Sequence, residues 1–179
     1  MKIRRTLAAA LCLLTTGACA DEAADRVEVV RRAREMIDST FKGDFVGVLK
    51  FTHPAISKIS GGEEPLKKAI TGVAAKMKEL KLEFVSMDVQ PPEMFYGKDG
   101  KTFALVKTKT MMIIPGKTRI TEGGTMIAVR ETPEGAWTFL RVNAKLAADR
   151  AMLKRLLPDF PDEAVLEAPG RPLTEQLGK

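Results

Sequence analysis

The only histidine, His53, is the residue best suited to acid–base chemistry, because the ordinary pKa of an imidazole lies near neutral pH. A general base also needs a partner that orients it, and Asp44 is the candidate. Local sequence favours plainer roles for both residues. Pro54 follows His53, a pattern typical of a turn residue that bonds to backbone, and Asp44 follows Gly43, a pattern typical of a helix N-cap. We expect a structural or ligand-contact role for His53, with catalysis as the open alternative.

Other site chemistries find little support in the residue types. One histidine and no cysteine after residue 20 exclude a histidine-rich or thiolate metal site, and no D-x-D-x-D-G calcium loop is present. No Gly-x-Ser-x-Gly elbow accompanies His53, and Gly61-Gly62 lacks the Lys and Ser/Thr spacing of a phosphate loop. We therefore predict no metal and no cofactor, and we assign no catalytic residue.

The N-terminus resembles a secretory signal. Three basic residues lie among the first five, residues 6–17 are uncharged and rich in Leu and Ala, and Ala18-Cys19-Ala20 offers a small-x-small cleavage site. We predict a signal peptide over 1–20 and a periplasmic or secreted protein that begins at Asp21. Thr16-Gly17-Ala18-Cys19 supports an alternative, lipidation of Cys19 and a membrane-anchored lipoprotein.

Composition limits the partners of the exported chain. Cleavage after residue 20 removes three of 29 basic residues and no acid, which leaves 26 against 23 and a net charge of +3. With one Trp, one Tyr and no basic cluster between aromatics, nucleic-acid binding is not expected. The remaining chain is the size of one domain, has no cysteine for a disulfide, and has no later apolar stretch of the roughly 20 residues that span a bilayer.

Helical periodicity dominates the first half of the exported chain. Apolar residues recur every three or four positions over 27–41, and Lys42-Gly43 is a plausible end. A short second helix is predicted after Asp44, with His53-Pro54 ending it. The strongest helix follows Gly61-Gly62, and we predict that its stripe packs over a sheet. The stripe consists of Leu66, Ile70, Val73, Met77 and Leu80.

Alternating periodicity begins at Leu82 and predicts strands over 82–89, 94–96, 102–114, 117–131 and 136–142. Their turn-sized connections favour an antiparallel meander, and Gly123-Gly124 predicts a bulge or bend. Asp149 is expected to cap a final short helix before Pro158. The predicted domains are therefore an α+β unit over 21–143 and a C-terminal helix with a proline-containing tail over 144–179.

This order of elements resembles the nuclear transport factor two-like, cystatin-like cone superfamily, specifically its small exported bacterial members. The resemblance covers residues 24–142 and rests on four segments: Phe41-Lys42-Gly43-Asp44-Phe45, Thr52-His53-Pro54, Gly61-Gly62 and Trp137-Thr138-Phe139. It implies N-terminal helices packed on a curved antiparallel sheet, in a cone-shaped α+β barrel with a mostly apolar conical pocket. Such a fold implies a pocket and no particular chemistry.

We therefore expect an exported non-catalytic binding or interaction module for a small apolar ligand or a protein partner segment. A small isomerase or dehydratase that uses His53 or Tyr96 is the alternative, and a homodimer through the sheet is a further expectation. Core packing competes with a ligand role for the methionines and for Trp137. The pocket candidates are Phe45, His53, Met77, Tyr96, Thr108, Thr110, Met126 and Trp137.

Overall fold

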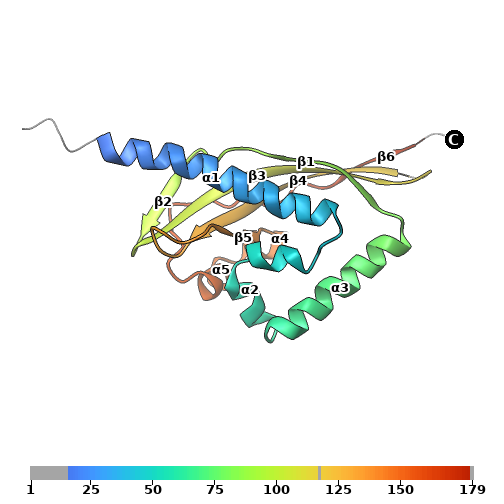
Figure 1. The fold of residues 1–179 in the computed structure, drawn as a ribbon, viewed down its shortest axis with the longest axis horizontal. Helices are drawn as coiled ribbons and strands as arrows, with labels where there is room; N and C mark the ends of the chain where they lie inside the picture. The colour runs from blue at the N-terminus through green and yellow to red at the C-terminus, as the bar shows by residue number, and fades with distance from the viewer. Residues whose placement is uncertain (1–15, 117, 178–179) are drawn as a thin grey trace, which may run out of the picture.

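The computed structural model describes the backbone of residues 16–116 and 118–177 and the side chains of residues 22–116 and 118–177. Residues 1–15 of the predicted signal, and the side chain of Cys19, lie outside this description. The chain folds into an open antiparallel sheet of six strands with helices, which confirms the α+β class (Figure 1). Its elements are α1 (Thr16–Phe41), the 3-10 helix η1 (Gly47–Phe51), α2 (Pro54–Ile59), α3 (Glu63–Glu79), β1 (Glu83–Val89), β2 (Phe95–Lys98), β3 (Lys101–Ile114), β4 (Thr118–Arg130), β5 (Thr138–Arg141), α4 (Ala144–Ala148), α5 (Arg150–Leu156) and β6 (Leu173–Gln176).

The long hairpin of β3 and β4 forms the centre of the sheet. β1 and β2 pair with successive parts of β3, and β5 and β6 pair with successive parts of β4. The predicted bulge at Gly123-Gly124 is wrong, because these glycines face Lys109 and Thr108 in an unbroken register. They lie between the segments of β4 that β5 and β6 cover, and the register shift lies in β1 instead, between Phe84 and Ser86.

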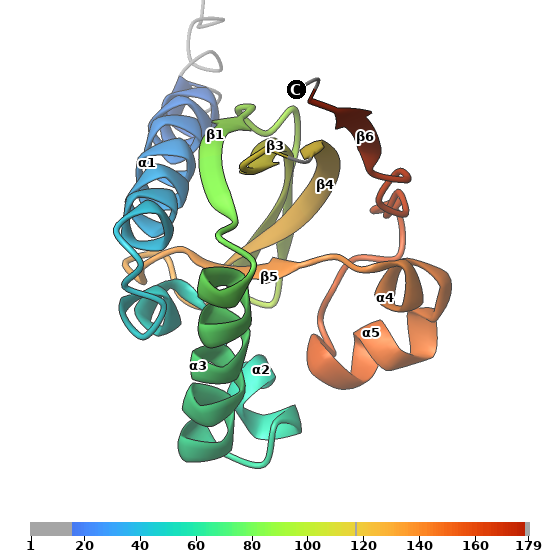
Figure 2. The ribbon, with the colours of Figure 1, turned by 90° about the vertical axis from the view of Figure 1, so that its right-hand side faces the viewer.

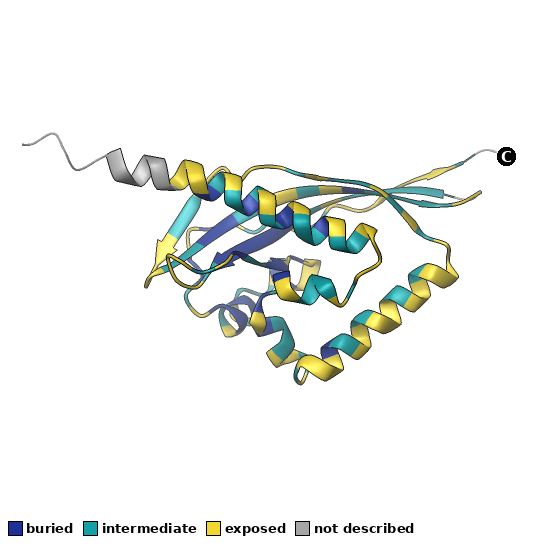
Figure 3. Cartoon of the chain, viewed as in Figure 1, coloured by how far each residue is buried: buried dark blue, intermediate teal, exposed yellow. Residues whose placement is uncertain are grey.

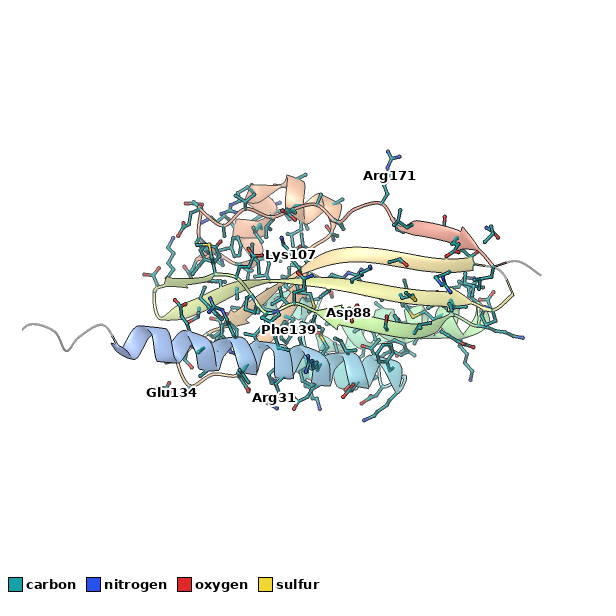
Figure 4. The ribbon with its side chains drawn as sticks, turned by 90° about the horizontal axis from the view of Figure 1, so that it is seen from above. Arg31, Asp88, Lys107, Glu134, Phe139 and Arg171 are labelled. Carbon is teal, nitrogen blue, oxygen red and sulfur yellow. The ribbon has the colours of Figure 1, made fainter. Side chains whose placement is uncertain are left out.

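Alternating side chains of β3 and β4 divide between two apolar clusters, one on each face of the sheet. In Figures 2 and 4, α1 lies along one side of the strands and the C-terminal helices lie along the other. The first cluster joins α1 and η1 to the sheet through Val29, Ala33, Phe51, Ala104, Val106, Met126, Ala128, Trp137 and Phe139. The second joins the sheet to α4 and α5 through Phe103, Ile127, Val129, Leu140, Leu146, Leu153 and Phe160, among others.

Helix α1 begins at Thr16 and therefore includes part of the predicted cleavage region. It is fixed to β4 by Asp25, whose two carboxylate oxygens accept hydrogen bonds of 2.5 and 2.7 Å from the Arg130 guanidinium. Arg26 donates to the carbonyl oxygens of Pro92 and Glu93 at 3.0 and 2.9 Å. These charged contacts supplement the apolar face of the helix with directional bonds.

Helix α3 lies apart from the strands in Figures 1 and 2, and most of its surface is exposed or half-buried in Figure 3. Leu66 is buried, but Val73 is 55% exposed and Leu80 is 44% exposed. The prediction that this stripe packs over the sheet is therefore wrong for these two residues. Neither of the two apolar clusters that pack against the sheet includes a residue of α3.

The C-terminal segment is better structured than its sequence predicted. The N-cap at Asp149 is confirmed, since its Oδ1 accepts from the Met152 amide at 2.8 Å. Two elements of this segment were not predicted. They are α4, which Asn143 caps by accepting a hydrogen bond from the Leu146 amide, and the strand β6.

Helix α2 was also not predicted, because His53-Pro54 was interpreted as a helix end, whereas proline here occupies the first turn of a new helix. No helix of the described part of the chain is both long and apolar enough to cross a bilayer.

Candidate functional site

His53 is 5% exposed and has both ring nitrogens engaged. Its Nδ1 accepts from the Ala55 amide at 3.2 Å and caps α2, and its Nε2 lies 2.9 Å from Oε1 of Glu131. Because Nδ1 accepts, a neutral ring carries its proton on Nε2, and this N–H donates a hydrogen bond to Oε1 of Glu131. Asp44 does not orient His53. Its Oδ1 accepts from the Gly47 amide at 2.8 Å at the start of η1.

Glu131 continues the polar chain to two further charged side chains. Its Oε2 lies 2.9 Å from Nζ of Lys101, which lies 2.9 Å from Oδ2 of Asp159. Burial alone would raise the pKa of Glu131, but the hydrogen bonds from Lys101 and His53 outweigh burial and lower that pKa. The hydrogen bond to Lys101 lowers the pKa of Asp159, and the bonds to Asp159 and Glu131 raise the pKa of Lys101.

This polar chain borders a cavity of about 460 Å³ between α2 and α5. These polar contacts connect the start of α2, the start of β3, the residue after β4 and the turn after α5. His53 has no free ring nitrogen that could take a proton from a substrate without breaking the α2 cap. The geometry therefore suits a structural tie better than a general base.

A larger and mostly apolar groove of about 790 Å³ lies between the end of α1, α3 and the start of β1. Phe41 and Phe84 both line it and contact each other edge to face, with ring centroids 5.9 Å apart. Val85 is 50% exposed at the groove and Phe41 is 41% exposed. On the α3 side the lining includes Ala74 and Ala75, whose small side chains occupy little of the groove. The remaining apolar lining comes from Phe45, Met77 and Leu82.

The polar groups of the groove are few. The hydroxyl groups of Thr40 and Thr71 donate to helix carbonyl oxygens of Met36 and Lys67, at 3.0 and 2.9 Å, so their protons do not face a ligand. Lys78 and Glu83 are the charged residues of the lining. The groove can therefore hold an apolar group by desolvation and contains no pair of groups suited to proton transfer.

The structure distributes the predicted pocket residues over several places. Phe45 and Met77 line the apolar groove, and His53 lines the cavity between α2 and α5. Tyr96 lines a third cavity of about 210 Å³, together with Leu105 and Glu163 among others.

The other four candidates lie within the sheet and its core. The Thr108 hydroxyl donates to the Gly124 carbonyl oxygen at 3.2 Å, which ties β3 to β4. The remaining three are buried, with exposed fractions of 3% for Thr110, 3% for Met126 and 1% for Trp137.

Two partners in these contacts were missed from the sequence. Glu131 is 78 positions from His53, and Arg130, whose guanidinium lies 4.9 Å from the Trp137 ring centroid, is 105 positions from Asp25. No local pattern marks such pairs, because strand pairing and helix docking create them. The one available signal was the position of both residues at the end of a predicted strand.

Comparison of the chain with protein-family models, with curated proteins and with solved structures found no match.

Proposed function

We propose that the chain is an exported, non-catalytic binding module whose groove between α1, α3 and β1 holds a small, mostly apolar ligand. The observation that carries this proposal is the groove itself, with a volume of about 790 Å³ and three phenylalanines in its lining. Its volume lies within the range of about 300 to 1,000 Å³ that is common for small-molecule sites. Exposed apolar surface of this kind is costly unless a ligand or partner covers it.

The enzyme alternative has weaker support. An isomerase or dehydratase based on His53 would need a free ring nitrogen, and both nitrogens are engaged. Tyr96 lines a different cavity from His53, so the two residues do not form one acid–base pair. The binding proposal needs no proton transfer and agrees with the apolar lining of the groove.

The resemblance to the cone-shaped superfamily belongs to this proposal. Its support is the burial of Val29 and Ala33 of α1 in one cluster with strand residues Val106 and Met126. The groove lies beyond that cluster, where α1 ends and α3 does not close against the sheet. A protein segment is the alternative occupant, and homodimerisation through the sheet stays a prediction that light scattering can test.

Export is the second part of the proposal, and the signal-like N-terminus supports it. We expect a mature chain that begins at Asp21 and is released into the periplasm or secreted. Intact mass spectrometry of the exported protein tests this directly. A lipid-modified Cys19 at the N-terminus would replace it with the membrane-anchored alternative.

Nile red fluorescence tests the groove, because this uncharged dye brightens in apolar sites. We expect saturable binding to the wild-type protein and strong weakening in Ala74→Trp, which places an indole in the groove. Ala69→Trp is the matched control, since Ala69 is exposed on the same helix and lies outside the groove lining. Equal dye binding by the two variants would refute the groove as the site, and denaturation curves would confirm that both variants fold.

A further inference from the structure

We infer that the cavity between α2 and α5 is a second binding site, for a small carboxylate that carries a compact apolar group. This site is separate from the apolar groove, and its existence does not depend on the proposed function of that groove. The cavity has a volume of about 460 Å³, which is ample for one small molecule.

The first observation is that two cationic side chains in the lining of the cavity have no partner in the described chain. Two of its lining residues are exposed cations, Lys58 on α2 and Arg155 on α5. Neither makes an ion pair or a side-chain hydrogen bond with another residue of the described chain. They stand on separate helices that border one cavity, so both can attract an anion that binds within it.

The second observation is that the acids of the cavity are already committed. Glu131 is engaged by His53 and Lys101, and Asp159 is engaged by Lys101, each contact being 2.9 Å. The cluster of Glu131, Lys101 and Asp159 therefore carries a net charge of −1, which does not balance the two positive charges of Lys58 and Arg155. Without counting His53, the lining has three cationic side chains against two carboxylates, and this net positive charge favours an anionic ligand.

The third observation is the apolar wall of the same cavity. Phe103, Leu156 and Leu157 line it and belong to the buried cluster under α5. Ile59 at the end of α2 also lines it and is 58% exposed, so apolar surface continues to the rim. A ligand with a carboxylate at one end and a compact apolar body can satisfy both the cations and this wall, whereas a fully hydrated inorganic anion leaves the wall uncovered.

Benzoate is the probe, and the unique aromatic side chains are the reporters. The chain contains one histidine and one tryptophan, so each gives a single set of side-chain NMR signals. His53 lines the cavity, and Trp137 is buried in the cluster on the opposite face. We expect benzoate to shift the His53 signals in a saturable manner and to leave the Trp137 indole signal unchanged.

Charge-matched ligands and variants test the assignment. Benzyl alcohol and benzylammonium should each bind at least about fivefold more weakly than benzoate. Arg155→Gln and Lys58→Gln should each weaken benzoate about three- to fivefold, the size expected for one exposed ion pair. Arg171→Gln is the control, because Arg171 projects from the C-terminal segment in Figure 4 and lies outside the lining. It should leave benzoate affinity unchanged.

Several results would overturn the inference. Equal affinity for benzoate and benzyl alcohol would remove the role of charge, and equal affinity for benzoate and inorganic phosphate would remove the role of the apolar wall. Equal effects of Arg155→Gln and Arg171→Gln, or shifts of Trp137 in place of His53, would place the ligand elsewhere. The Nile red assay is independent of all these outcomes, so the groove proposal can stand or fail separately.

Discussion

The ion pair between Asp25 and Arg130 gives the sharpest stability prediction. The Asp25 and Arg130 side chains are only 12% and 18% exposed, and two hydrogen bonds join them. Removal of one member of a buried pair costs about 3 to 5 kcal/mol, because the remaining charge loses its partner. Since both side chains keep some contact with solvent, we expect Asp25→Ala to lower the free energy of unfolding by about 2 to 4 kcal/mol.

A double variant separates the value of the pair from the cost of an orphaned charge. Arg130→Met keeps an apolar side chain beside the Trp137 ring, and by itself it leaves Asp25 without its partner. Combined with Asp25→Leu, it removes both charges. This double variant should be more stable than Asp25→Leu alone or Arg130→Met alone. The coupling free energy of the cycle should reach about 1 to 3 kcal/mol.

Urea denaturation followed by tryptophan fluorescence is the assay. Trp137 is the only tryptophan, is 1% exposed and lies against Arg130, so its emission reports the unfolding of this region. Arg31→Gln is the control, since Arg31 pairs with Glu28 and Glu35 on the exposed side of α1, and its effect on the free energy of unfolding should lie within the error of the assay. If Asp25→Ala costs no more than this control, the reasoning about burial is refuted.

Three further predictions concern the polar chain and α3. His53→Ala should lower the unfolding free energy by about 1 to 2 kcal/mol in urea denaturation, through loss of the α2 cap, and should leave Nile red binding unchanged. The pKa of Glu131 is lowered in the folded state, so its contribution to stability is present above the ordinary carboxyl pKa and is lost as pH falls through the lowered value. Lys101→Gln should reduce this loss at acidic pH, as measured by the free energy of unfolding against pH. The reduction should be small because the Glu131 side chain is 47% exposed. Leu66→Ala should cost about 2 to 4 kcal/mol and Val73→Asp less than about 0.5 kcal/mol in the same assay, and a large loss for Val73→Asp would show that α3 docks after all.

The strands were largely predictable, because side-chain alternation is a local consequence of strand geometry. The predicted starts and ends of β1 and β3 lie within one residue of those observed. The N-cap at Asp149 was equally local, since its bond reaches only the Met152 amide.

Docking was less predictable than local structure. The stripe on α3 has helical spacing whether or not a surface covers it, and the C-terminal helices cover a face of the sheet. In the same way, His53 was recognised as a candidate, but its contact with Glu131 exists only because β4 ends beside the start of α2. For the same reason the sequence did not predict which pocket candidates lie together, because their positions depend on long-range packing.

Helix α1 runs unbroken from Thr16 to Phe41 and so joins the predicted cleavage region to the apolar groove. Cleavage after Ala20 would shorten this helix by its first five residues but leave the bond from Asp25 to Arg130 intact. If Cys19 instead carries a lipid, the helix becomes a spacer, because 22 residues at 1.5 Å each separate the anchor from Phe41 by about 33 Å. A helix that stands upright on the membrane would then present the groove at Phe41 to molecules of the aqueous space, and not to lipids of the membrane that anchors it.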